Sequence, residues 1–128
     1  MVIDRYNGFT VLDNLHVKGQ LTLGENIADI GGLSVAYEAF KTFTKQGKGN
    51  EKIDDFTPDQ RFFLAFGQIW RAKLRDEALR LRINTDPHSP EQFRANGPLS
   101  NFEPFYKAFG VQPGDKMYRP EANPVKIW

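Results

Sequence analysis

Glu25 and Asp29 are the first residues in this sequence whose type and spacing could do chemistry, because they are carboxylates four positions apart. If the segment is helical, this spacing places both side chains on one face. Two negative charges so placed repel each other, and burial among apolar neighbours raises the cost of keeping both ionised. A divalent metal ion or strong hydrogen-bond donors would relieve that cost. A simpler interpretation stays open, in which Glu25 caps the helix and Asp29 is solvated.

A second candidate group consists of Asp86, His88 and Arg94. His88 stands just before an expected helix start, where backbone N–H groups favour anions. Asp86 can hold one ring nitrogen of His88, so that the other nitrogen points outward as a donor. Arg94 can bind a carbonyl or a carboxylate through its planar guanidinium group. The alternative is a surface histidine and a surface arginine on either side of a helix cap.

The composition excludes several classes of function. With a net charge of +1, neither nucleic acid nor an anionic membrane would attract the chain strongly, so we expect no nucleic-acid partner. The absence of cysteine rules out disulfides and thiolate metal sites. His16 and His88 are the only imidazoles, so a self-contained zinc site would need both of them together with carboxylates.

The elements that must position these residues are predicted to be helices. A long helix is expected over residues 23–45, with Thr22 and Glu25 forming a capping box at its start. Between Ile27 and Phe43 apolar residues surround the helix axis, which predicts burial on nearly all sides.

Three further helix starts are marked by capping patterns. Thr57-Pro58-Asp59-Gln60 opens a second long helix, which continues, with or without a break, to about Ile83. Ser89-Pro90-Glu91-Gln92 opens a short helix that Gly97 is expected to end. Ser100-Asn101-Phe102-Glu103 opens another, with Gly110 as its end.

The two ends of the chain carry weaker patterns. Residues 1–21 indicate irregular structure or short strands, and residues 111–128 indicate an extended strap. The whole chain, residues 1–128, is predicted to be a single, mainly α-helical domain.

Taken together, the two candidate groups resemble a family of zinc peptidases. The run LTLGENIADIGGLSVAYEAF resembles the segment that follows the HExxH helix in neprilysin, endothelin-converting enzyme and bacterial oligopeptidase O. The runs FFLAFGQIW and RINTDPHSPEQFRANGPLSNFEPFYKAFG are similar to the C-terminal segment of the same family, and the ending PVKIW to its aromatic terminus. The likeness covers nearly all of residues 6–128, in the family's order.

The resemblance implies a role for each candidate residue. Glu25 would be the third protein ligand of a catalytic zinc, beside two histidines from HExxH. Asp29 would bind the free N–H of a ligand histidine. His88 would stabilise the oxyanion that forms when water attacks the peptide carbonyl, with Asp86 orienting its ring. Arg94 would hold a backbone carbonyl of the substrate.

The resemblance also implies what the chain is part of. The fold would be the C-terminal helical subdomain of a thermolysin-like (gluzincin) catalytic domain, and the parent would hydrolyse peptide bonds in oligopeptides. HExxH occurs nowhere in the sequence, so the general base and two zinc ligands are missing from it. We therefore expect zinc in the parent, no metal bound by this chain alone, and no activity of this chain alone.

The same interpretation predicts partners and a source. The missing N-terminal part of the catalytic domain would cover the first long helix. Without it, an apolar patch around Ile27, Ile30 and Leu33 would be exposed and drive formation of a homo-oligomer. The family's animal members carry a cysteine near the terminus that is absent here, which favours a bacterial parent, in the cell envelope or secreted, with a cytoplasmic location left open.

Two other interpretations stay open. In the first, the chain is a stand-alone helical interaction module derived from the same fold, which binds a protein through its apolar face. In the second, it is a small metal-binding protein that uses His16, Glu25, Asp29 and His88.

Overall fold

A computed structural model describes residues 1–119 of the chain, and within them the fold is mainly helical, as predicted. The last part of the expected strap, with the PVKIW ending, lies outside the described residues. No helix of the described part is long and apolar enough to cross a membrane. The elements are α1 (Val2–Asn7), β1 (Thr10–Leu12), β2 (Leu15–His16), α2 (Leu23–Lys45), α3 (Pro58–Ile69), α4 (Asp76–Thr85), α5 (Glu91–Leu99) and α6 (Glu103–Phe109).

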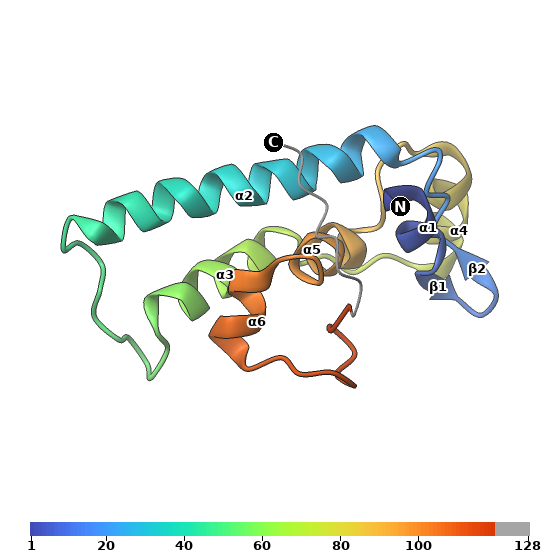
Figure 1. Cartoon of the computed structure of the whole chain (residues 1–128). Coiled ribbons are helices and arrows are strands. Elements are labelled where there is room, and N and C mark those ends of the chain that lie inside the picture. The colour runs from blue at the N-terminus through green and yellow to red at the C-terminus, as the bar shows by residue number, and fades with distance from the viewer. Residues whose placement is uncertain (120–128) are drawn as a thin grey trace.

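Helix α2 runs along one side of the molecule. Helices α3, α5 and α6 lie together on the opposite side of the molecule (Figure 1). Helix α1, the β1–β2 hairpin and α4 gather near the N-terminal end of α2 (Figure 1). The strands pair antiparallel, with Thr10 opposite His16 and Leu12 opposite Leu15. Residues 1–21 therefore contain a helix that the sequence pattern did not predict, as well as the expected short strands.

The bounds of α2 agree with the prediction, but the capping box at its start is wrong. The Thr22 side chain makes no capping bond and instead donates to the carbonyl oxygen of Lys18, at 3.2 Å. The Glu25 carboxylate turns away from the helix start and lies 3.1 Å from the His88 ring. Since the Glu25 carboxylate faces His88 instead, it is not used to satisfy the first backbone N–H groups.

Helix α2 is covered on one side only, so the prediction of burial all round is wrong. Ile30 and Leu33 are buried, at 5% and 2% exposed, and Ile27 is partly buried. The patch expected to be exposed around these residues is therefore inside the described fold. The exposed apolar surface lies on the opposite side, where Val35 is 56% and Phe43 48% exposed. Both sides of α2 are apolar, and the pattern alone does not tell which one the neighbouring helices cover.

Most of the buried apolar residues form two clusters. The N-terminal core surrounds the first turns of α2 and consists of Tyr6, Val17, Ile30 and Phe93. The aromatic core lies farther along α2, where α3 and α6 pack, and consists of Leu33, Tyr37, Phe63 and Leu99, with Phe40, Phe62, Phe66, Phe102, Phe105, Ala108 and Met117 packed against it. The two cores hold successive parts of α2 against the rest of the fold.

The later helix starts were predicted with mixed success. At α3 the capping box is confirmed, because Thr57 Oγ1 accepts from the Gln60 N–H at 3.2 Å and Gln60 Oε1 accepts from the Thr57 N–H at 2.9 Å. The expected continuation is broken, since residues 70–75 separate α3 from α4. Ser89 and Ser100 do not cap α5 and α6, because their hydroxyls donate to Asn26 and to the Gly97 carbonyl instead.

The two glycines expected to end helices behave differently. Gly110 ends α6 in the left-handed conformation, at φ 66°, as predicted. Gly97 does not end α5, which continues through Pro98 to Leu99. A glycine is needed at 97 for another reason: a Cβ there would overlap the hydroxyl of the buried Tyr6.

Candidate functional site

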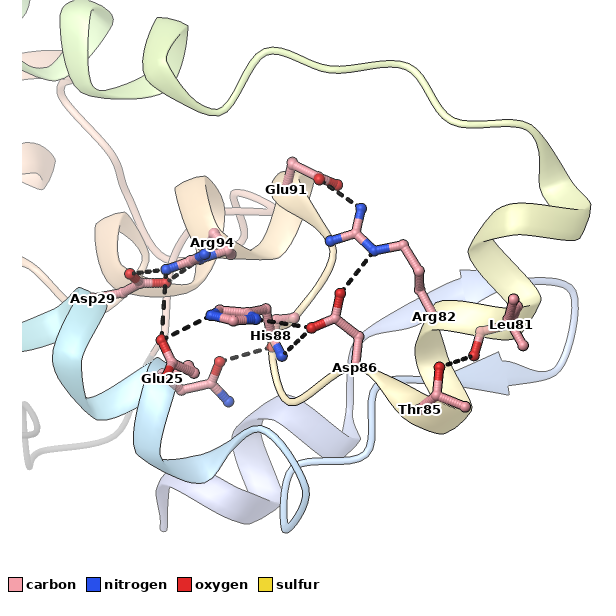
Figure 2. Close-up of polar contacts among 11 residues, drawn as sticks. Glu25, Asp29, Leu81, Arg82, Thr85, Asp86, His88, Glu91 and Arg94 are labelled. Carbon is pink, nitrogen blue, oxygen red and sulfur yellow. Dashed lines mark hydrogen bonds and ion pairs between the residues drawn. The ribbon is translucent and has the colours of Figure 1, made fainter.

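The candidate residues from both parts of the sequence meet at the N-terminal end of α2. Glu25 and Asp29 project from its first turns toward Arg94 on α5, and His88 comes from the loop between α4 and α5 (Figure 2). Asp86, in the same loop, lies beside His88 on the side away from Glu25 (Figure 2). The five predicted site residues thus form one connected cluster.

Asp29 and Arg94 make a bidentate ion pair. Arg94 Nε donates to Asp29 Oδ2 and Nη2 to Oδ1, both at 2.8 Å. The side chains are 9% and 18% exposed, so the pair is largely shielded from water. The hydrogen bonds to Asp29 raise the pKa of Arg94 above its usual value, although burial acts against this. Arg94 is therefore the cation that allows two carboxylates to share one face of α2.

His88 is held between two carboxylates. Its Nδ1 lies 2.8 Å from Asp86 Oδ1, and its backbone N–H donates to the same oxygen at 2.9 Å. Its Nε2 lies 3.1 Å from Glu25 Oε2, and Arg94 Nη2 lies 4.0 Å from that same oxygen (Figure 2). Asp86 thus holds one ring nitrogen, as predicted, while the other faces Glu25.

Asp86 is kept ionised by its neighbours. The backbone N–H of His88 and then the His88 ring and Arg82 lower the pKa of Asp86 to about 2, against the opposing effect of burial. Arg82 Nε donates to Asp86 Oδ2 at 3.0 Å, and Arg82 Nη1 donates to Glu91 Oε1 at 2.7 Å. Burial is the largest single influence on Glu91 and raises its pKa, but the hydrogen bond from Arg82, a backbone hydrogen bond and the charge of Arg82 together lower the pKa below its usual value.

Three residues of this cluster were missed at the level of sequence. Arg82 binds Asp86, and Glu91 binds Arg82. The four-residue spacing of Arg82 and Asp86 was a signal that could have found Arg82. Trp70 covers Arg94, whose Cζ lies 4.0 Å from the ring centroid. A tryptophan beyond the end of α3 gives no local sign of that contact.

The residues present fit part of a metal site. Glu25 offers a half-exposed carboxylate at the edge of the cluster, with 42% of its side chain exposed. Within residues 1–119, however, no three histidine, cysteine, aspartate or glutamate side chains are placed so that they could share a metal ion. His16 lies in the hairpin, 3.4 Å from Thr10 Oγ1, and does not join the cluster. The four residues of the self-contained metal-binding interpretation, His16, Glu25, Asp29 and His88, are therefore not placed together as ligands.

Comparison with known proteins shows what this arrangement belongs to. The sequence model described as Peptidase family M13 matches residues 1–125. The chain belongs to peptidase family M13. An endothelin-converting enzyme homolog of Locusta migratoria is 42% identical over 99% of this chain, and human endothelin-converting enzyme-like 1 is 40% identical over 99%. The chain spans only 17% and 16% of these two relatives.

A solved structure of the Mycobacterium tuberculosis zinc metalloprotease Zmp1 is similar to this M13 chain over 99% of its length. The TM-score is 0.91 and the sequence identity 39%, and the match covers 20% of the Zmp1 chain. The resemblance to the neprilysin and endothelin-converting enzyme family is thus confirmed, as is the helical subdomain. The relatives come from animals and from a bacterium, so the comparisons do not support a bacterial source over an animal one.

Proposed function

We propose that this chain is the C-terminal part of the catalytic domain of a zinc-dependent M13 metalloendopeptidase that hydrolyses peptide bonds in oligopeptides. The observation that carries the proposal is the convergence of Glu25, His88 and Arg94, with their partners Asp86 and Asp29, at one end of α2. The comparisons support it, because the relatives with endothelin-converting enzyme names and the Zmp1 zinc metalloprotease match nearly the whole chain.

Glu25 is proposed as one ligand of the zinc ion. A zinc ion held by Glu25 and two histidines of a HExxH segment supplies Lewis-acid activation of the attacking water. In this chain, His88 and Arg94 both lie beside Glu25 Oε2 and so restrict the rotation of the carboxylate. The ligand is therefore already oriented by its neighbours.

His88 is proposed to stabilise the oxyanion of the peptide under attack. Asp86 holds Nδ1 and the backbone N–H of His88, so the ring has a fixed orientation. Its Nε2 is directed to the side of the cluster where Glu25 lies, from which it can donate to an oxygen as negative charge develops there. Because the donor is oriented before the reaction, little reorganisation is needed in the transition state.

Arg94 is proposed to hold a backbone carbonyl of the substrate. Asp29 uses Nε and Nη2 of the guanidinium, which leaves Nη1 for another acceptor. Trp70 packs on the guanidinium plane and limits its movement. Asp29 anchors Arg94 here. Its carboxylate has further lone pairs with which to accept from a ligand histidine of the zinc site, the role that the family resemblance implies.

The remaining predictions concern the chain's surroundings. We propose that zinc is bound only together with the missing N-terminal part of the catalytic domain, because within residues 1–119 the proposed zinc site has one ligand, Glu25. The isolated chain is then inactive, and it forms a homo-oligomer through apolar surface that the missing part would cover. A bacterial source, with the parent in the cell envelope or secreted, stays our expectation.

The test compares two glutamates of the same helix in the full-length peptidase that contains this chain. Glu25→Gln removes the proposed ligand charge, whereas Glu38→Gln changes an exposed glutamate farther along α2. We expect Glu25→Gln to lose bound zinc and hydrolysis of a reporter peptide, and Glu38→Gln to keep both. Retention of stoichiometric zinc and of the full rate by Glu25→Gln would overturn the proposal.

A further inference from the structure

A chain of buried hydrogen bonds runs directly behind the candidate site. Ser89 Oγ donates to Asn26 Oδ1 at 2.7 Å, across 63 positions of sequence. Asn26 Nδ2 donates to Thr22 Oγ1 at 2.8 Å, and Thr22 Oγ1 donates to the carbonyl oxygen of Lys18 at 3.2 Å. Asn26, Ser89 and Thr22 are 0%, 1% and 3% exposed, so water does not reach these groups.

The donor and acceptor directions of these hydrogen bonds require asparagine at position 26. The Thr22 hydroxyl has its proton committed to a backbone carbonyl, so it can only accept from residue 26. The Ser89 hydroxyl is the donor on the other side, so residue 26 must accept there. Of the residues with a similar shape, asparagine both accepts and donates, aspartate cannot donate when ionised, and leucine does neither.

The hydrogen bond between Ser89 and Asn26 joins two residues that each stand next to a proposed site residue in the sequence. Asn26 follows Glu25 on α2, and Ser89 follows His88 in the loop before α5. The hydrogen bond therefore ties the backbone of Glu25 to the backbone of His88 from the buried side. On the exposed side, the same two backbones carry the side chains whose Oε2 and Nε2 atoms lie 3.1 Å apart.

We infer that Asn26 and Ser89 are positioning residues, which set the placement of Glu25 relative to His88. The inference rests on the proposed function, in which Glu25 binds zinc and His88 stabilises the oxyanion. The Asp29–Arg94 pair also joins α2 to α5, but the proposed role of Arg94 is to bind substrate directly. The Asn26–Ser89 bond is sealed from substrate and solvent, so its contribution is to geometry.

A matched pair of serines separates positioning from simple stability. Ser100 is also 1% exposed, and its hydroxyl donates to the Gly97 carbonyl at 3.0 Å, away from the site. In the full-length zinc-loaded peptidase, Ser89→Ala and Ser100→Ala each remove one buried hydroxyl. We expect both to lower the melting temperature, Ser100→Ala by less, because the Gly97 carbonyl still accepts from Asn101 Nδ2 at 2.6 Å. Ser89→Ala alone is expected to lower kcat by roughly 10-fold or more and to speed zinc loss to a chelator, with KM little changed.

Thr22 gives a second test that does not alter the loop of His88. Thr22→Val keeps the shape but removes the acceptor for Asn26, whereas Thr22→Ser keeps the hydroxyl. We expect Thr22→Val to speed zinc loss and lower kcat and Thr22→Ser to preserve both. Equal behaviour of the two Thr22 variants, or of the two serine variants, in kcat and zinc loss would overturn the inference.

The glutamate variants show which claim has failed. If Glu25→Gln loses zinc and activity while Ser89→Ala behaves like Ser100→Ala, the positioning inference alone is overturned. If Glu25→Gln keeps zinc and activity, the proposed function is overturned, and the positioning inference with it.

Discussion

Two parts of α2 are held by different kinds of interaction. In the middle of the helix, Leu33 and Tyr37 enter the aromatic core, where the rings of Tyr37 and Phe63 stack at 5.4 Å between centroids. At its N-terminal end, Asp29 and Arg94 are joined at 2.8 Å in a network of charged groups. Apolar packing depends on area and volume, whereas hydrogen bonds depend on direction. Both parts of α2 also pack against an apolar core, so the comparison teaches that the charged network at the N-terminal end adds direction to packing and thereby places the candidate reactive groups.

The largest effect is expected from emptying the aromatic core. Phe63 is 2% exposed, and Phe63→Ala removes its packing and leaves a cavity, which we expect to cost about 3–5 kcal/mol of unfolding free energy. Leu64→Ala, at a position 39% exposed, is the control and should cost much less. Urea unfolding of the chain measures both. Equal losses for the two variants would show that the aromatic core is not the main source of stability.

A smaller loss of stability is expected from breaking the ion pair of the site. Arg94→Met leaves Asp29 largely buried without its cation, which we expect to cost about 2 kcal/mol, between the values for exposed and fully buried pairs. Lys107→Met removes an exposed cation that pairs with Glu103, with side chains 74% and 72% exposed, and should leave stability unchanged. In the full-length peptidase, Arg94→Met should also reduce peptide hydrolysis. A variant that hydrolyses peptide at the full rate would remove Arg94 from the mechanism.

The pH dependence of stability should show the contribution of Asp86. Its pKa is about 2 in the folded chain against 3.8 for an unperturbed aspartate. A lowered pKa gives stability that is present above the unfolded value and is lost as the pH falls toward the folded value. We expect Asp86→Asn to be less stable than the unmodified chain at pH 6 by about 1 kcal/mol, after allowance for solvent screening.

This difference should shrink as the pH falls from about 4 to about 2, because Asp86 becomes protonated over that range. Unfolding free energies measured at a series of pH values give the comparison. A difference that stays constant down to pH 2 would mean that the charge of Asp86 does not contribute.

The smallest effect on stability is expected on the exposed side of α2. Val35 and Phe43 lie outside both cores, so replacing both with serine should change the unfolding free energy by less than about 1 kcal/mol. We expect the same change to weaken self-association of the chain, because it removes exposed apolar surface. Sedimentation equilibrium measures this. An unmodified chain that is monomeric at micromolar concentration would contradict the expected homo-oligomer.

The local parts of the fold could be predicted from sequence, and the parts that depend on tertiary contacts could not. The bounds of α2 and the capping box of α3 follow from neighbouring residues, and both agree with the structure. Which side of α2 is covered depends on α3 and α5, and no pattern within α2 decides between Ile30 and Val35. The capping role assigned to Ser89 failed because its hydroxyl has a partner 63 positions away.

The candidate site divides in the same way. Resemblance singled out Glu25, Asp29, His88 and Arg94, with Asp86 as an extension from the spacing, and the structure brings all five together. The resemblance could not show that Asp29 also binds Arg94. That contact joins α2 to α5, and a distant ion pair leaves no periodic signal in the sequence.

The central claim is that Glu25 is a zinc ligand, and the most direct test is a crystal structure of the full-length peptidase with data collected at the zinc absorption edge. The anomalous signal locates the zinc ion without reference to the protein atoms. We predict a Glu25 carboxylate oxygen at about 2.0–2.2 Å from that ion, the distance usual for a carboxylate ligand of zinc. A zinc ion bound elsewhere, with Glu25 facing solvent, would contradict the account.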